Sequence, residues 1–247
     1  MGQFGVIIPA VKKSVAFTDD LVKKLDGISL IQRAIDKAKQ LAPAARVHLI
    51  TDSEEIRLVG ERNAVRVYYN RDLRLRGRDF VAGLRPMLLE VARQYPALVL
   101  LHPYTPLVGA EVIVDAWRTF RRRGCDILLS VKQEPHRAYR QADASLESML
   151  LDAAGEQLLT EVRAFQILRS EVLTGAVGQP RLHAYHLNHD AVEIGCYQDW
   201  WICEKLARRR RIVFRIIGDA QVGMGHIYRA LALAHEITDH EIIFACD

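Results

Sequence analysis

Apolar and polar residues alternate in blocks through the first two-thirds of the chain, and the blocks predict strands and helices in turn. Helical spacing of apolar residues, or acidic residues at a helix start, predicts helices that begin near residues 30, 52, 80 and 111. Short apolar runs rich in β-branched residues are typical of buried strands, and they lie at residues 4–10, 47–51, 65–69, 98–101 and 126–131. The alternation predicts an α/β fold with a mostly parallel sheet between helices.

A polar loop follows the first predicted strand directly. It contains Lys12, Lys13 and Ser14, and a helix begins beyond Gly27. A buried strand that runs into a loop and then a helix places the loop at the carboxyl edge of the sheet, where open α/β sheets bind their ligands. We expect the ligand site there. The two lysines either face a phosphate or are ordinary solvated loop residues.

The pattern loosens beyond residue 132. Residues 164–168 and 183–187 predict two strands of a smaller lobe, and residues 199–210 predict a helix. The last stretch predicts a βαβ unit of its own, with a strand at 211–218, a helix at 228–236 and a strand at 241–247. We therefore expect two domains, residues 1–208 and residues 211–247.

Composition narrows the class of protein. A chain of 247 residues with 50% hydrophobic content can bury a sizeable core. The net charge of +4 suits a phosphate-bearing substrate without requiring nucleic acid, and the four cysteines form no CxxC pair, which favours a reducing compartment. No stretch approaches the ~20 apolar residues of a membrane span. We expect a cytoplasmic protein that binds neither nucleic acid nor membrane.

Seven short motifs occur along residues 1–208 in the order found in one enzyme family. They include IIPA at residues 7–10, TDSEEI at 51–56, HPYTPL at 102–107, DILLSV at 126–131 and EIGCYQDW at 193–200. The others are DGISLIQRAI at residues 26–35 and the trio Arg71, Leu73 and Asp79. In this order the motifs resemble those of the cytidylyltransferases that activate nine-carbon sugar acids, the CMP-sialic acid synthetases and their legionaminic and pseudaminic relatives.

The resemblance implies a Rossmann-like, GT-A-like nucleotidyltransferase fold with a small extra lobe, and a reaction in surface polysaccharide biosynthesis. The anomeric hydroxyl of a nonulosonic acid attacks the α-phosphate of CTP, pyrophosphate leaves, and Mg²⁺ assists. A homodimer that pairs through the lobe within residues 132–190 is implied as well. Lys12 and Lys13 take the catalytic positions, and Glu193 and Asp199 the metal positions. Nucleotide or sugar contacts are implied for Ala10, Ser14, Asp52, Arg71, Asp79, His102 and Thr105.

Several of these positions have a second interpretation. Val11, Val15 and Leu21 stand where the family has an arginine, a lysine and an asparagine, and Lys12 and Lys13 replace two glycines. The chain could therefore be a catalytically degenerate scaffold domain that binds a nucleotide or sugar. Three carboxylates, Asp52, Asp79 and Asp199, precede or begin predicted helices and could serve as caps, and His102 could be a hydrogen-bonded core histidine.

The tail resembles another family. Residues 212–247 contain a G-x-G-H-x-x-R core at Gly223, Gly225, His226 and Arg229. This core resembles the N-terminus of the UDP-sugar hydrolase of pseudaminic acid synthesis, and the resemblance implies that His226 is the candidate base. We expect a truncated start of a GT-B-like domain, fused to the first domain and unable to hydrolyse a substrate alone.

Overall fold

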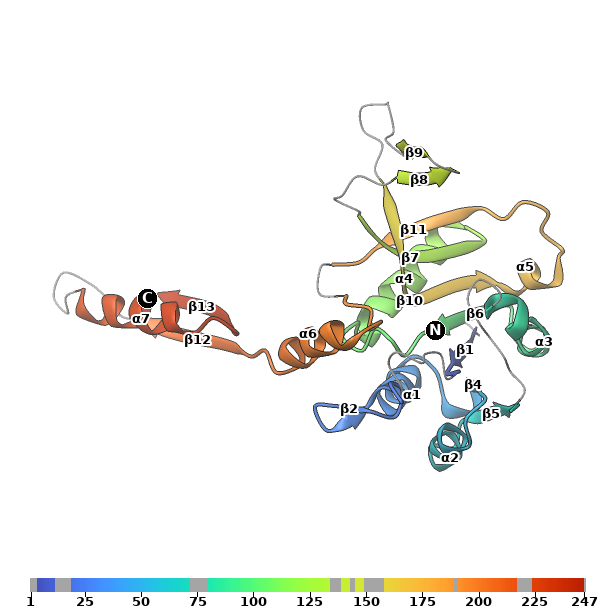
Figure 1. The fold of residues 1–247 in the computed structure, drawn as a ribbon, viewed down its shortest axis with the longest axis horizontal. Coiled ribbons are helices and arrows are strands. Elements are labelled where there is room, and N and C mark those ends of the chain that lie inside the picture. The colour runs from blue at the N-terminus through green and yellow to red at the C-terminus, as the bar shows by residue number, and fades with distance from the viewer. Residues whose placement is uncertain are drawn as a thin grey trace.

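The computed structural model describes residues 4–11, 19–71, 80–133, 139–142, 145–148, 158–188, 191–216 and 224–246. These residues form an α/β fold around a seven-stranded sheet with strand order β11-β7-β10-β6-β1-β4-β5 (Figure 1). All neighbouring strands are parallel except β10, which is antiparallel to both β6 and β7. The strands are β1 (Phe4–Pro9), β4 (Val47–Thr51), β5 (Arg66–Tyr69), β6 (Ala97–Leu101), β7 (Ile127–Gln133), β10 (Leu159–Arg169) and β11 (Leu182–His186). The predicted α/β class with a mostly parallel sheet is confirmed.

Helices cover both faces of the sheet. The helices α1 (Leu30–Leu41), α2 (Glu54–Arg62) and α4 (Ala110–Arg123) pack on one face, and α3 (Phe80–Ala92) and α5 (Ser170–Thr174) on the other. Alternate residues of a strand point to opposite faces. In β6, Val99 and Leu101 therefore join the first core, while Leu98 and Leu100 join the second. This two-sided burial explains why the central strands are continuous apolar runs.

Local sequence signals set several element boundaries. The Ser29 hydroxyl accepts a hydrogen bond from the Gln32 N–H at 3.3 Å and so caps α1. Gly124 ends α4 with φ of 61°, a left-handed conformation that favours glycine. A short hairpin of β2 (Lys24–Leu25) and β3 (Ile28–Ser29) precedes α1, and a 3₁₀ turn, η1 (Ala44–Arg46), precedes β4. No helix in the described ranges is long and apolar enough to cross a membrane.

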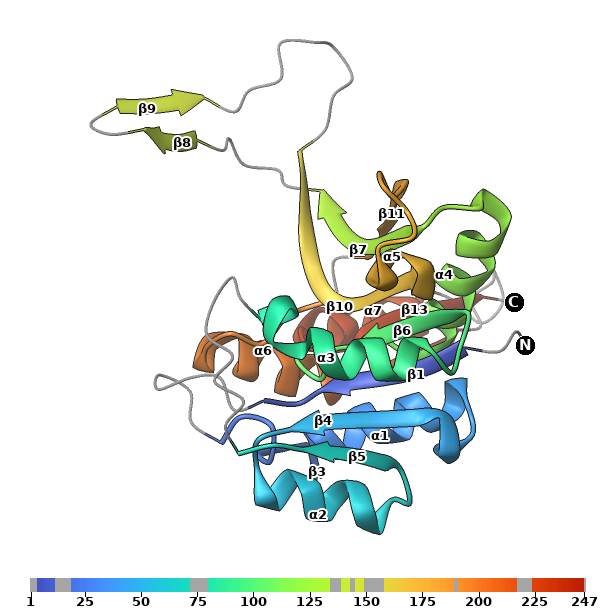
Figure 2. The same ribbon diagram turned by 90° about the vertical axis from the view of Figure 1, so that its right-hand side faces the viewer.

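The expected smaller lobe does not contain the strands predicted for it. Residues 164–168 lie in β10 and residues 183–186 in β11, and both strands are members of the central sheet. β10 lies between β6 and β7 and is antiparallel to both. Because this position covers both of its faces, its apolar residues pack in both cores of the sheet. The helix–strand rhythm gave no sign of such an insertion. Outside the sheet, a hairpin of β8 (Tyr139–Ala142) and β9 (Ser145–Ser148) projects away from it (Figure 2).

The tail forms its own small sheet, as predicted. The helix α6 (Tyr197–Ala207) leads to β12 (Arg211–Ile216), α7 (Gly225–Glu236) and β13 (Glu241–Cys246). The two strands are parallel, and the rings of Phe214 and Phe244 lie 5.6 Å apart. Figure 1 shows β12, β13 and α7 beyond α6, away from the seven-stranded sheet. The division into two domains stays a prediction.

Candidate functional site at the carboxyl edge of the sheet

Four neighbouring parallel strands, β6, β1, β4 and β5, end at one edge of the sheet. The register pairs Pro9 with Ile50, Thr51 with Tyr69, and Ile7 with Leu100. The chain therefore leaves β1 at Ala10, β4 at Asp52, β5 before Arg71 and β6 at His102 on this same edge. Figure 2 shows β1 and β4 pointing to the same side. Four residues of the predicted site, Ala10, Asp52, Arg71 and His102, follow strands that end at this edge.

The loop between β6 and α4, residues 102–108, forms one wall of this edge. His102, Tyr104 and Thr105 are buried. Backbone hydrogen bonds fix the loop from two sides, since the His102 N–H donates to the Ala164 carbonyl at 3.0 Å and the Ile194 N–H donates to the Tyr104 carbonyl at 2.8 Å. The buried Thr105 Oγ1 has no hydrogen-bond partner among the described residues. Two backbone hydrogen bonds therefore tie this wall to its neighbours, and the wall contains a buried polar atom without a partner among the described residues.

An acidic group faces the same loop. Burial, followed by the negative charge of Asp20, raises the pKa of Tyr104, and Asp52 contributes in the same direction. Asp20 is itself only 6% exposed. Asp20 is not among the site residues that the sequence motifs indicate. Its preceding neighbour Asp19 has φ of 59°, so a tight turn folds Asp20 inward, and no sequence signal marks such a turn.

The other predicted nucleotide or sugar contacts differ from one another in burial and in hydrogen-bond partners. Asp52 does not cap α2, because the N-cap is Ser53, whose N–H donates to the Thr51 hydroxyl at 3.1 Å. Arg71 is exposed, and its Nε donates to the Tyr69 hydroxyl at 2.9 Å. Ala10 is fully buried, and its N–H donates to the Ile50 carbonyl at 2.8 Å. Ala10 therefore extends the sheet by one residue before the loop begins.

Several predicted residues lie outside the described ranges. They are Lys12, Lys13, Ser14, Asp79 and Gly223. Their roles stay predictions.

The two predicted metal ligands are engaged in separate contacts. Arg163 donates its backbone N–H to Glu193 Oε2 at 3.0 Å and its Nε to Oε1 at 2.6 Å. Asp199 Oδ2 accepts the N–H groups of Gly195 at 2.9 Å and Cys196 at 3.0 Å, which caps α6. Within the described ranges no group of three or more His, Cys, Asp or Glu residues could hold a metal ion. Mg²⁺ is usually held by one or two carboxylates together with substrate phosphates, so the metal roles of Glu193 and Asp199 stay predictions.

The tail residues lie on a different element. Gly225 is the first residue of α7, and His226 and Arg229 lie in its first two turns, all three exposed. In Figure 1 this helix lies beyond α6 and apart from the carboxyl edge. The structure does not bring these residues to the candidate site.

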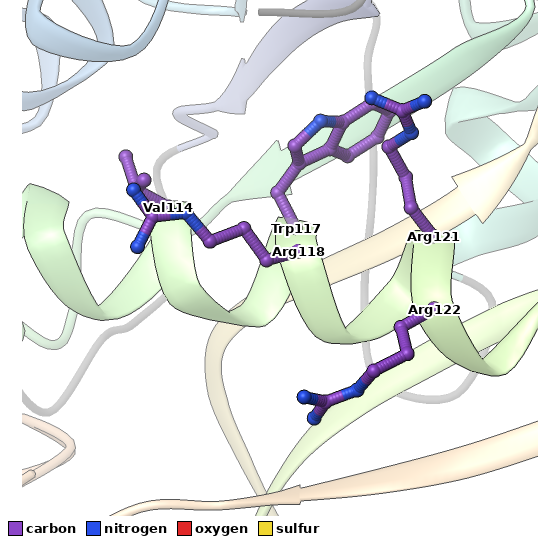
Figure 3. Close-up of a pocket in the computed structure, with 5 residues that line it drawn as sticks. All are labelled: Val114, Trp117, Arg118, Arg121 and Arg122. Atoms are coloured by element: carbon purple, nitrogen blue, oxygen red, sulfur yellow. The ribbon is translucent and has the colours of Figure 1, made fainter.

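A second surface feature is a cavity of about 530 Å³ on the outer side of α4. Trp117 and three arginines, Arg118, Arg121 and Arg122, line it together with Val114 (Figure 3). Trp117 packs on Phe4 with ring centroids 4.5 Å apart, and Phe4 is the first residue of β1. The cavity therefore lies toward the amino end of β1, opposite the edge where ligands bind in such sheets.

Comparisons with known proteins identify the fold of this chain. No protein-family model matches the sequence, and no curated protein is similar to it in sequence. One similar solved structure is CMP:2-keto-3-deoxy-manno-octonic acid synthetase complexed with CTP, with a TM-score of 0.63 and 12% identity over 83% of this chain and 98% of that chain. Another is 4-diphosphocytidyl-2C-methyl-D-erythritol synthase from Anaerococcus prevotii, with a TM-score of 0.61 and 8% identity over 84% of this chain and 97% of that chain. At these identities the likeness shows that the chain has the α/β fold of these synthases.

Proposed function

We propose that the chain is a cytidylyltransferase that binds CTP at the carboxyl edge of β1, β4 and β6 and activates a nonulosonic acid. The observation that carries the proposal is the convergence of Ala10, Asp52 and the loop 102–108 at one edge. These are the places where the sequence motifs resemble those of the nonulosonic acid cytidylyltransferases. The likeness in fold to a synthetase complexed with CTP supports the nucleotide. The sugar acid rests on the motif resemblance.

The proposed reaction forms one bond and breaks another at the α-phosphorus of CTP. The sugar's anomeric oxygen bonds to that phosphorus, its proton leaves to a base, and the bond to the β-phosphate oxygen breaks to release pyrophosphate. The chain's contribution is to place the two reactants in line and to neutralise the phosphates. The Asp20 and Asp52 carboxylates act on Tyr104 at this edge, next to the loop where the nucleotide or sugar would be held.

In this proposal, Lys12 and Lys13 supply the positive charge that neutralises the triphosphate. Of the described arginines near the edge, Arg163 pairs with Glu193, and Arg71 donates to Tyr69. A partly buried site cannot hold several negative charges without partners. Glu193 and Asp199, at the predicted metal positions, would hold Mg²⁺, which would offset the negative charge of the triphosphate.

Thermal-shift measurements with CTP, UTP and ATP, each with and without Mg²⁺, test the proposal. A ligand that binds the folded state raises its melting temperature by mass action. We expect the largest shift with CTP. A coupled pyrophosphate assay with CTP and a panel of nonulosonic acids then tests turnover. A protein that shifts with no nucleotide under any condition contradicts the proposal.

The second candidate is a non-catalytic scaffold domain that binds a sugar or nucleotide. One observation favours it: Val11, at the family's arginine position, is 2% exposed and packs with Ile7, Ile50 and Leu84 in the second core. The position serves packing here and not phosphate binding. A shift with sugar acid alone, without nucleotide binding or pyrophosphate release, would support the scaffold function.

A further inference from the structure

Lys37 is a buried lysine on α1. It is 8% exposed and is the one Lys or Arg among the described residues that is buried. Its neighbours on the same side of α1, including Ala34 and Ala38, pack in the first core. Lysine almost never occupies such a position without a specific partner, because removal of the ammonium from water is costly.

The partner is the candidate site loop. Lys37 Nζ donates a hydrogen bond to the Thr105 carbonyl at 3.2 Å, across 68 positions of sequence. The other bond to this carbonyl comes from the Val108 N–H within the loop, at 3.4 Å. The His102 N–H and the Tyr104 carbonyl are tied to β10 and to the segment before α6. Lys37 is thus the side chain that ties the middle of the loop to α1.

We propose that Lys37 is a positioning residue that holds the Thr105 carbonyl and so keeps the loop 102–108 in the shape that binds the nucleotide or sugar. The role in binding rests on the proposed function, whereas the hold on the loop does not. A methionine would fill the same space without the burial of a charge. The charge acts on the Thr105 carbonyl and on Glu111, and the bond to the carbonyl holds the wall that carries Thr105 and His102.

The charged groups that act on Lys37 give the contact a pH dependence. Burial lowers the pKa of Lys37 to about 8, Glu111 on α4 raises it, and Arg33 on α1 lowers it. Loss of the proton above that pH weakens a charge-assisted bond, so the loop should loosen. Global stability should change in the opposite direction, because an unfolded lysine keeps its proton up to its ordinary pKa of 10.5. The unfolded state then holds more protons between the two values, and the Lys37 contribution to stability rises with pH.

Hydrogen exchange of the full chain, measured without ligand, tests the hold on the loop. The variants are Lys37→Met, which removes the donor, and Lys37→Arg, which keeps one. Lys39→Met is the matched control, since Lys39 is an exposed lysine on the same helix that bonds Asn63 at 3.0 Å. We expect Lys37→Met to raise exchange in peptides of residues 102–109 by about tenfold, as local opening becomes easier, and the control to leave it unchanged. Lys37→Arg should restore part of the protection.

CTP titration of the same proteins tests the role in binding. We expect Lys37→Met to weaken CTP binding by about fivefold or more, because the loop must be ordered on binding. The pH dependence of loop exchange gives a further test. In the parent, exchange of the loop, corrected for the intrinsic rate of exchange, should rise as the pH passes about 8, while global stability does not fall. In Lys37→Met this rise should be absent. Unchanged loop exchange in Lys37→Met overturns the inference, whether or not CTP binds. Faster loop exchange with unchanged CTP affinity overturns the role in binding. A parent that binds no CTP refutes the proposed function, and loop exchange then still decides whether Lys37 holds the loop.

Discussion

At the scale of single residues, the described part of the carboxyl edge offers more negative than positive charge to a nucleotide. Asp20 and Asp52 act on Tyr104, whereas Arg163 and Lys37 are bound to Glu193 and the Thr105 carbonyl. A triphosphate therefore needs cations from elsewhere, and the sequence supplies Lys12 and Lys13 next to Val11. This distribution of charge makes those two lysines decisive for the proposed function.

The double variant Lys12→Ala with Lys13→Ala should weaken CTP binding by about tenfold or more, because each charge-assisted contact contributes about 1.5–3 kcal/mol. The melting temperature without ligand should stay nearly unchanged. Lys24→Ala is the matched control, since Lys24 is an exposed lysine of the nearby hairpin. Isothermal titration measures the affinities. Equal affinity of the double variant and the parent would mean that both lysines face solvent.

Val11→Arg, which restores the family's residue, should destabilise the protein and not improve binding. Val11 is 2% exposed among apolar side chains, so an arginine there would bury an unpaired charge. We expect a loss of about 2–4 kcal/mol in the free energy of unfolding, measured by urea denaturation. The sequence alone did not show that this position belongs to the core. Tighter CTP binding without loss of stability would show that the arginine reaches the site.

His48 should make the protein less stable in mild acid. It is fully buried on β4, and burial, with a smaller effect of Arg66, lowers its pKa from 6.5 to about 4. The unfolded state binds the proton between these values, so stability present above pH 6.5 is lost as the pH falls toward 4. This amounts to about 2 kcal/mol between about pH 7 and pH 5. Urea midpoints of the parent and of His48→Asn should show this fall in the parent and a smaller one in the variant.

At the scale of elements, the sequence predicts those helices and strands whose positions are set by local patterns of apolar and turn-forming residues. The strand at residues 47–51 and the helix end at Arg123 match β4 and α4, because apolar periodicity and a following glycine mark them. The place of β10 could not be predicted. Its apolar residues fit any buried strand, and only pairing with β6 and β7 makes it an antiparallel member of the sheet. The inward turn of Asp20 and the burial of Lys37 depend in the same way on tertiary packing.

Asp199 caps α6 in the structure and is also a predicted metal ligand, and two variants can distinguish these roles. Its Oδ2 accepts two backbone N–H groups at the start of the helix, so Asp199→Ala should lower stability by about 1 kcal/mol whether or not a metal binds. Asp199→Asn keeps an acceptor oxygen and should restore most of that stability. Melting temperatures with and without Mg²⁺ measure both effects. If Asp199 is also a metal ligand, Asp199→Asn should remove any Mg²⁺-dependent shift that CTP produces, and an unchanged shift would limit Asp199 to its cap.

At the scale of the whole molecule, the described residues of the tail bury little apolar surface. A parallel sheet is normally covered on both faces, yet among the described residues of the tail one helix, α7, accompanies β12 and β13. Val213, Tyr228 and Leu233 are 57%, 68% and 59% exposed. The ion pair between Lys205 on α6 and Asp239 joins exposed partners at 2.8 Å, and such pairs contribute about 0–1 kcal/mol.

Removal of residues 211–247 should therefore leave the seven-stranded sheet folded, with an unfolding free energy and a CTP affinity close to those of the full chain. The reason is that both cores of the sheet are built from residues before Arg211. Solubility should improve, since exposed apolar groups are lost with the tail. Limited proteolysis of the full chain should cut first near Arg208–Arg211, where four exposed arginines join α6 to β12. A shortened chain that loses its cooperative urea transition would show that the tail is part of the same folding unit.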